Sequence, residues 1–148
     1  RVPVAEFAEV VFDPDVTVDL RERLIEILSQ TENIYPVLAP RMEYAEGENA
    51  LILAELLVSS GARGEDVFEF LMRLTESAET LPRALQRIAE YGDERALPRL
   101  YELSGTCDYA LFTDIRSAVE WLGGEMDTER DWSADATFAA IKGNKEGK

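Results

Sequence analysis

Few residues of this chain are of types that could catalyse a reaction or hold a metal ion. It has no histidine and one cysteine, Cys107, which excludes catalytic triads, Cys-His dyads, histidine metal ligands, internal disulfides and thiolate zinc sites. Asp13, Asp15 and Asp19 are spaced like the first ligands of a calcium loop. The glycine and the closing glutamate that such a loop needs are absent, so we expect turn and cap residues there and no metal.

The remaining nucleophile and carboxylates do not form a catalytic pattern. Cys107 precedes Asp108 in an expected turn, where carboxylates are the only available bases, so we interpret it as a half-buried thiol. Paired acids such as Glu65-Asp66 reflect the abundance of acids, and a general acid also needs a desolvated cleft. The sequence has no glycine-rich phosphate loop and no serine elbow. We therefore expect no catalysis and no cofactor.

The charge of the chain limits its partners. Among 148 residues, 30 are acidic and 15 basic, which gives a net charge of −15, and 46% are hydrophobic. This apolar fraction is ordinary for a chain with a buried core. A field this negative repels phosphate backbones and anionic headgroups, so we expect a protein partner, more naturally a basic one, and neither nucleic acid nor membrane.

No stretch of the sequence is long enough to cross a bilayer. The longest apolar run, Ala50 to Val58, is interrupted by Glu55 and is about half the roughly 20 residues that a spanning helix needs. We expect a cytoplasmic protein. The first residue is Arg1 rather than methionine, which leaves a lost leader or an upstream domain open.

Three glycines recur at a fixed interval, and each follows a segment of helical periodicity. Gly61, Gly92 and Gly123 are 31 residues apart. The same offsets before each glycine give twelve positions, eleven of them apolar: Ala50, Leu53, Leu57 and Ser60; Leu81, Ala84, Ile88 and Tyr91; Phe112, Ile115, Val119 and Leu122. Their spacing places each set on one helix stripe, and glycine adopts the left-handed C-cap without steric cost. The pattern predicts three equivalent helices with equivalent ends.

A second set of helical segments alternates with these three. Val67, Phe70, Leu71 and Leu74 share one helical face, as do Ala96, Leu97, Leu100, Tyr101 and Leu103, and an earlier counterpart begins at Tyr35. Residues 4–12 and 20–28 form one more pair, and no run has the period of a strand. We therefore predict a single all-α domain of about four helix pairs, at about 1–31, 32–61, 62–92 and 93–123.

One unit carries a family resemblance. The segment Gly92-Asp93-Glu94-Arg95-Ala96-Leu97-Pro98-Arg99-Leu100, followed by Asp114-Ile115-Arg116-Ser117-Ala118-Val119-Glu120-Trp121-Leu122-Gly123, resembles a HEAT-like repeat close to the phycobilisome-lyase type. The preceding unit, from Gly61 to Gly92, lacks the proline and the second-helix arginine. The resemblance implies a right-handed αα-superhelix, an armadillo-like α-solenoid, whose second helices line a concave face that binds macromolecules. It implies no lyase activity.

The C-terminal segment is expected to cap the last pair. After an acidic link, Ala134, Phe138 and Ile141 repeat at helical spacing, and Trp132 is placed to join them. We predict a link and capping helix over 124–142 and a frayed tail over 143–148. A disordered acidic tail is the alternative.

Candidate binding residues lie opposite the predicted core stripe. If Val119 faces the core, the helical step places Asp114, Ser117 and Trp121 on the other side. The same offsets in the earlier second helices give Arg83, Gln86 and Glu90, and then Ile52, Glu55 and Ser59. Tryptophan and arginine are enriched at interface hot spots, so Trp121 and Arg83 are the main candidates. A solvated face, with Trp121 covered by the tail helix, is the competing interpretation.

Three functional classes remain. We expect a non-catalytic helical-repeat scaffold that binds a partner protein through the concave face. The charge also fits an acidic immunity protein, inhibitor or nucleic-acid mimic that neutralises a basic toxin or nuclease. The third class, an enzyme that uses carboxylates, has no supporting constellation. The residues do not identify the partner or the oligomeric state.

Overall fold

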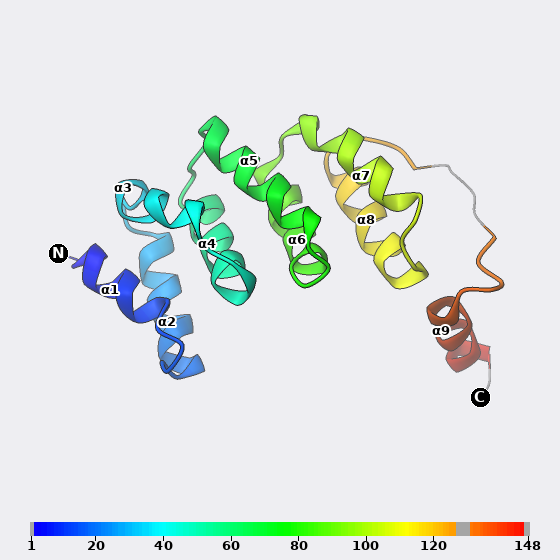
Figure 1. Ribbon diagram of the computed structural model, residues 1–148, viewed down its shortest axis with the longest axis horizontal. Coiled ribbons are helices and arrows are strands. Elements are labelled where there is room, and N and C mark those ends of the chain that lie inside the picture. The colour runs from blue at the N-terminus through cyan, green and yellow to red at the C-terminus, as the bar shows by residue number, and fades with distance from the viewer. Residues whose placement is uncertain (1, 127–130, 147–148) are drawn as a thin grey trace. The chain divides into compact units, whose positions relative to one another are not determined.

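Helices are the only regular secondary structure in the residues that the structure describes. The computed structural model (Figure 1) describes residues 2–126 and 131–146, the last four of these as backbone only. Within them no strand occurs, which confirms the predicted all-α class. The helices are α1 (Val4–Val11), α2 (Val18–Ser29), α3 (Tyr35–Leu38), α4 (Gly47–Ser59), α5 (Glu65–Arg73), α6 (Leu81–Tyr91), α7 (Leu97–Ser104), α8 (Tyr109–Trp121) and α9 (Ala136–Glu146). Three 3-10 turns, η1 (Ala39–Glu43), η2 (Leu74–Glu76) and η3 (Glu94–Ala96), adjoin α3, α5 and α7.

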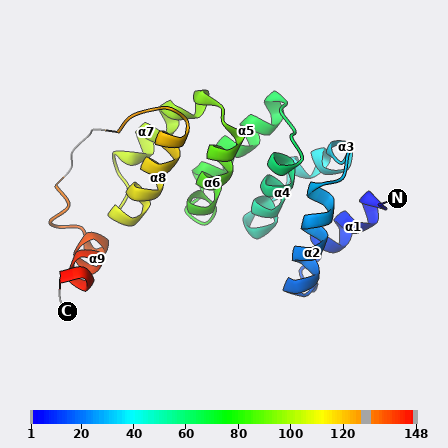
Figure 2. The same cartoon turned by 180° about the vertical axis from the view of Figure 1, so that it is seen from behind.

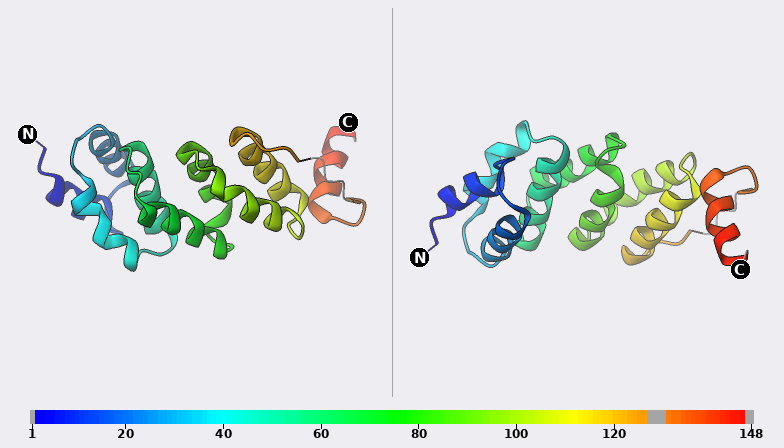
Figure 3. Two further views of the ribbon diagram at one scale, coloured as in Figure 1. Left: turned by 90° about the horizontal axis from the view of Figure 1, so that it is seen from above. Right: turned by 90° about the horizontal axis from the view of Figure 1, so that it is seen from below.

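The molecule divides into two compact units, and each is described by itself. Unit 1 is Arg1–Arg87 and unit 2 is Ile88–Lys148, with the division inside α6. In unit 1, α1 packs against α2 and α3, and α4 packs against α2, α3 and α5. The view from behind (Figure 2) brings the second helices α2 and α4 of these pairs to the front. In unit 2, α8 packs against α7 and α9, and Figure 3 shows α9 (orange to red) beyond the last pair.

The helices bury the predicted stripes. Of the twelve stripe positions, all are buried except Ser60, which is half-buried. Within the stripes, Leu53, Leu57, Ala84, Ile115 and Val119 are fully inaccessible to solvent. The periodicity therefore indicated the correct face of α4, α6 and α8.

The repeated glycines end their helices in the same conformation. Gly61, Gly92 and Gly123 have φ angles of 84°, 79° and 89°, a region that other residues enter at a cost of roughly 1–2 kcal/mol. After α4, the amide of Ala62 donates to the carbonyl of Leu57 at 3.1 Å. After α8, the amide of Gly124 makes the same bond to Val119 at 2.9 Å. Both bonds belong to the Schellman motif, so α4 and α8 share one type of C-terminal cap.

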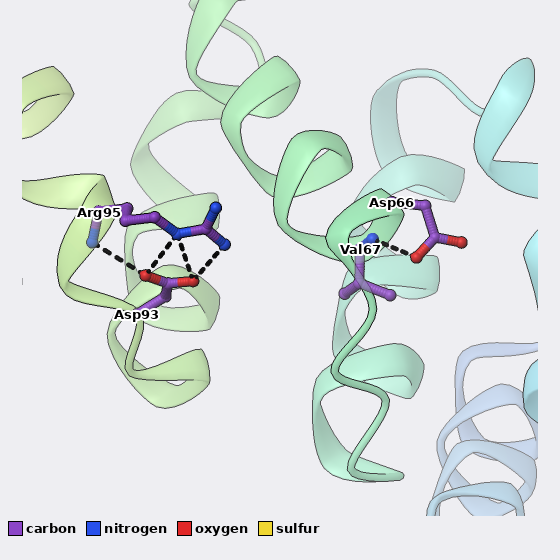
Figure 4. A network of polar contacts seen from close by, with 4 residues as sticks. All are labelled: Asp66, Val67, Asp93 and Arg95. Carbon is purple, nitrogen blue, oxygen red and sulfur yellow. Dashed lines mark hydrogen bonds and ion pairs between the residues drawn. The ribbon is translucent and has the colours of Figure 1, made fainter.

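Polar side chains fix the entries into several helices. The carboxylate of Asp93, in unit 2, accepts from the Arg95 amide at 2.9 Å and from the Arg95 guanidinium Nη2 at 2.7 Å (Figure 4). In unit 1, Asp66 Oδ1 accepts from the amide of Val67 at 2.8 Å, also in Figure 4. The Asp108 carboxylate caps α8 by accepting from the Leu111 amide at 2.9 Å. These acids satisfy donors that a helix leaves unpaired at its start.

Contacts between successive pairs in unit 1 join residues about one repeat apart. The hydroxyl of Tyr35 donates to the carboxylate of Asp66, 31 residues further on. Arg73 Nη2 donates to the carbonyl of Met42 at 2.5 Å, also across 31 residues. Arg41 forms an ion pair with Glu9, 32 residues earlier, at 3.3 Å. The same structural positions thus meet in consecutive pairs.

The C-terminal helix differs from its predicted bounds. Its first residue is Ala136, so Ala134 precedes it and is exposed, and it continues to Glu146 instead of ending at 142. The Asp135 carboxylate sets the start by accepting from the Phe138 amide at 3.0 Å. Gly143 does not end the helix, because an interior glycine costs only about 1 kcal/mol relative to alanine. The helix therefore extends past its predicted end at 142, while 147 and 148, like 127–130 of the acidic link, lie outside the described residues.

Candidate functional site

The predicted binding residue Arg83 is engaged by a neighbouring helix. On α6, its Nη1 and Nη2 donate to Oε1 and Oε2 of Glu48, on α4, at 2.6 and 3.1 Å. This two-point hydrogen bond lowers the pKa of the Glu48 carboxyl below its ordinary value and raises the pKa of the Arg83 guanidinium. Both side chains stay more than half exposed. The pair links two second helices of unit 1 across solvent-accessible surface.

A second charge pair joins the same two helices. Arg87 Nη2 lies 3.9 Å from Oε1 of Glu55, another predicted binding residue. Gln86, on α6 between the two arginines, is exposed as predicted. These five residues, Glu48, Glu55, Arg83, Gln86 and Arg87, define the α4–α6 face, which includes two ion pairs. Glu48, Arg83 and Gln86 are exposed, whereas Glu55 and Arg87 are half-buried.

One position of the predicted polar face is wrong. Ile52 was placed on this face but is buried, with only 4% of its surface accessible to solvent. The reason is that α4 packs against α2, α3 and α5, so seven of its thirteen residues are buried and the helix has no broad solvent face. The rule that places polar residues opposite the core assumes a helix that is buried on one side only.

The α8 face, defined by Asp114, Ser117 and Trp121, has a different character. All three side chains are exposed, as predicted, and Trp121 keeps 74% of its accessible surface. This is the largest exposed fraction among the large hydrophobic side chains in the described residues. Glu90, near the end of α6, is also exposed and falls in unit 2.

The tail packs on the opposite end of α8 from Trp121. The ring of Trp132 lies 5.2 Å from the ring of Tyr109 and 5.0 Å from that of Phe112, and Phe138 on α9 lies 4.8 Å from Tyr109. Tyr109 and Phe112 belong to the first turn of α8, whereas Trp121 is its last residue. The aromatic contacts of the tail therefore leave Trp121 exposed.

The predicted site residues divide between the units. Glu55, Arg83 and Gln86 belong to unit 1, and Glu90, Asp114, Ser117 and Trp121 belong to unit 2. Sequence reasoning missed Glu48, the partner of Arg83. A search for acids 35 residues before Arg83 would have found it, because this spacing equals one repeat length plus one helical turn of about four residues.

No group of three or more Asp, Glu or Cys side chains in the described residues is placed to hold a metal ion. The Cys107 side chain is half-buried and donates to the carbonyl of Ser104 at 3.7 Å. A shallow pocket in unit 1 is lined by Phe12, Arg41, Tyr44, Ala45, Glu46 and Asn49. The guanidinium of Arg41, one of the lining residues, lies 4.4 Å from the centre of the Phe12 ring and pairs with Glu9.

The calcium-like aspartates act as turn residues. Asp13 Oδ1 accepts from the amide of Asp15 at 2.9 Å, and Asp19 lies in the first turn of α2. A carboxylate there interacts favourably with the positive end of the helix dipole.

Comparison with family models, with curated proteins and with solved structures finds no match for this chain. Among the described residues, no helix has both the length and the apolar character that crossing a membrane requires.

Proposed function

We propose that this chain is a non-catalytic helical-repeat protein that binds another protein, with Trp121 as the anchor of the interface. The supporting observation is the 74% exposure of Trp121 on a helix whose opposite face is fully packed. A large aromatic side chain left in water is unfavourable unless a partner covers it, and tryptophan is among the residues most enriched at interface hot spots.

The proposal includes a HEAT-like repeat array with a right-handed superhelical arrangement. Three features of the described residues support it: alternating first and second helices, left-handed glycines at a 31-residue interval, and side-chain contacts that span 31 or 32 residues in unit 1. One helix pair cannot bury its apolar stripe alone, and stacking equivalent pairs solves that problem. Small-angle X-ray scattering tests the arrangement, because a superhelical array and a closed bundle of equal mass differ in radius of gyration.

A second candidate is an acidic antagonist of a basic protein, and charge favours it. Unit 1 contains 17 acidic and 8 basic residues, and unit 2 contains 13 and 7. Both units are thus negative, which would accelerate association with a basic toxin or nuclease at low salt.

The test is affinity capture from the native cell lysate at low and high salt, with wild type, Trp121→Ala and Tyr44→Ala. Tyr44 is the matched control, since it is also a large aromatic residue and 67% exposed. We expect Trp121→Ala to weaken capture of a specific protein by about 2 kcal/mol, roughly thirtyfold in affinity, at both salt concentrations. Tyr44→Ala should capture it normally.

The two candidates give different outcomes. Capture that disappears at high salt and is equal for all three proteins would support the acidic antagonist. Capture that is insensitive to Trp121 at both salt concentrations removes the basis for the anchor.

A further inference from the structure

The chemistry around Trp121 indicates which side chains its partner would present. The α8 face combines an indole with polar and acidic neighbours, because Ser117 precedes Trp121 by about one turn and Asp114 by two. Asp114 and Trp121 are seven positions apart, so they share one stripe of the helix, with their Cα atoms separated by about 10 Å along the axis. No other large apolar side chain occupies this stripe of α8.

The helix supplies no cation of its own to this face. Arg116 is the single basic residue of α8. It is turned about 140° away from Trp121 around the helix, and its guanidinium lies 5.9 Å from the centre of the Phe112 ring. Asp114 and Trp121 are therefore presented to solvent without an arginine from the same helix between them.

A cationic side chain from a partner would interact favourably with both the Trp121 indole and the Asp114 carboxylate. The face of an indole attracts cations more strongly than any other aromatic side chain, and a guanidinium stacks on it while its N–H groups remain available to carboxylates. A purely apolar partner would desolvate Asp114 without compensation. The charge of the whole chain, −15, attracts a basic segment from a distance as well.

We propose that the α8 face binds an arginine-bearing segment of a basic protein, with one guanidinium stacked on Trp121 and a second, about 10 Å away, paired with Asp114. The inference rests on the proposed function, since it names the occupant of the same surface.

Two peptides of equal composition and charge test the spacing. In acetyl-Arg-Pro-Pro-Arg-amide, the polyproline II conformation places both arginines on one side, about 9 Å apart. In acetyl-Arg-Arg-Pro-Pro-amide the arginines are adjacent and point to different sides. Binding to the isotope-labelled full chain is followed by NMR at the backbone amide of Ser117. The chain has two tryptophans, so the indole N–H signal of Trp121, assigned by its loss in Trp121→Leu, provides a second and direct reading.

We expect the spaced peptide to bind about two- to fivefold more tightly than the adjacent one, and Trp121→Leu to remove a similar factor. Asp114→Asn should abolish the difference between the peptides. The matched control is Asp15→Asn, which makes the same change at an exposed aspartate of unit 1 and should retain the difference. Circular dichroism verifies that the variants are folded.

Equal binding of both peptides in wild type, or equal losses in Asp114→Asn and Asp15→Asn, would show attraction by net charge alone and overturn the inference. Tighter binding of a neutral leucine peptide would overturn it too. The proposed function is judged separately, because capture of a protein that depends on Trp121 survives any of these results.

Discussion

The α4–α6 face of unit 1 and the α8 face of unit 2 use their side chains in different ways. On the α4–α6 face, Arg83 and Arg87 are occupied by Glu48 and Glu55 of the neighbouring helix. On the α8 face, Trp121 is exposed and the only arginine of the helix is directed to Phe112. The first face therefore uses its charges within the fold, and the second leaves an aromatic side chain available. Polar residues opposite a core stripe thus do not have one common role.

The exposed face of α8 lies opposite a packed core stripe of the same helix, and breaking that stripe has the largest expected effect. Ile115→Ala, at a side chain with no exposure on α8, should lower the free energy of unfolding by about 2 to 5 kcal/mol, because it removes methyl groups and leaves a cavity. Urea denaturation measures the change. The neighbouring exposed Asp114→Ala should stay within about 0.5 kcal/mol; similar losses for the two would mean that the faces of α8 have been exchanged.

The glycine that ends α8 is the next most sensitive position. Gly123 has φ of 89°, and no atom of another residue beyond its chain neighbours lies within 4 Å of the place that a β-carbon would take. Gly123→Ala should therefore cost roughly 1–2 kcal/mol through the backbone alone. Gly105→Ala is the control, since Gly105 has an ordinary φ of −75° and its nearest neighbour, the Glu102 carbonyl oxygen, would lie 3.5 Å away. Thermal unfolding of both variants checks this. A cost at Gly105 as large as at Gly123 would contradict a conformational origin.

Removing one residue from each face separates the two roles. Arg83→Ala should lower the free energy of unfolding by at most about 1 kcal/mol, and less at high salt, because an exposed ion pair is weak and screened. Trp121→Ala should change it by no more than about 0.5 kcal/mol at any salt concentration. Urea denaturation at two salt concentrations measures both. If Trp121→Ala were the more destabilising, Trp121 would belong to the packing of unit 2, and the distinction between the faces would fail.

The smallest expected effect concerns pH. The hydrogen bond to Arg83 lowers the pKa of Glu48 in the folded state below its ordinary value of 4.5. Its stabilising contribution is therefore fully present above about pH 4.5 and is lost as the pH falls through the lower folded-state pKa. The difference in stability between wild type and Arg83→Met, measured by urea denaturation across this range, should shrink toward acid. A difference that grows on acidification would have the wrong sign for this pair.

The helix pairs were predictable because their signals are local. The stripe through Phe112, Ile115 and Val119 requires only the helical period, and the glycine after it requires only the rules of helix caps. Some boundaries shifted for equally local reasons. The helix predicted to begin at Leu20 begins at Val18, because the Thr17 hydroxyl caps it by accepting from the Leu20 amide at 3.2 Å.

The features that the sequence did not predict depend on neighbours. Ile52 is buried because α4 is covered by helices on several sides, and no count along α4 reveals them. The Arg83–Glu48 pair joins residues 35 positions apart. The 31-residue repeat does not place these two residues at equivalent positions. The exposure of Trp121 depended on whether the tail packs at the first or the last turn of α8, and only the contacts of Trp132 decide that.

The bonds from Arg73 end on main-chain oxygens, those of Met42 at 2.5 Å and Ala45 at 3.5 Å. A carbonyl oxygen is present whatever side chain its residue carries. Substitutions at positions 42 and 45 can therefore accumulate without altering the acceptor, and the arginine alone must be retained. Hydrogen bonds of this kind, from a side chain to main-chain oxygens, allow successive helix pairs to differ in sequence while keeping the same packing.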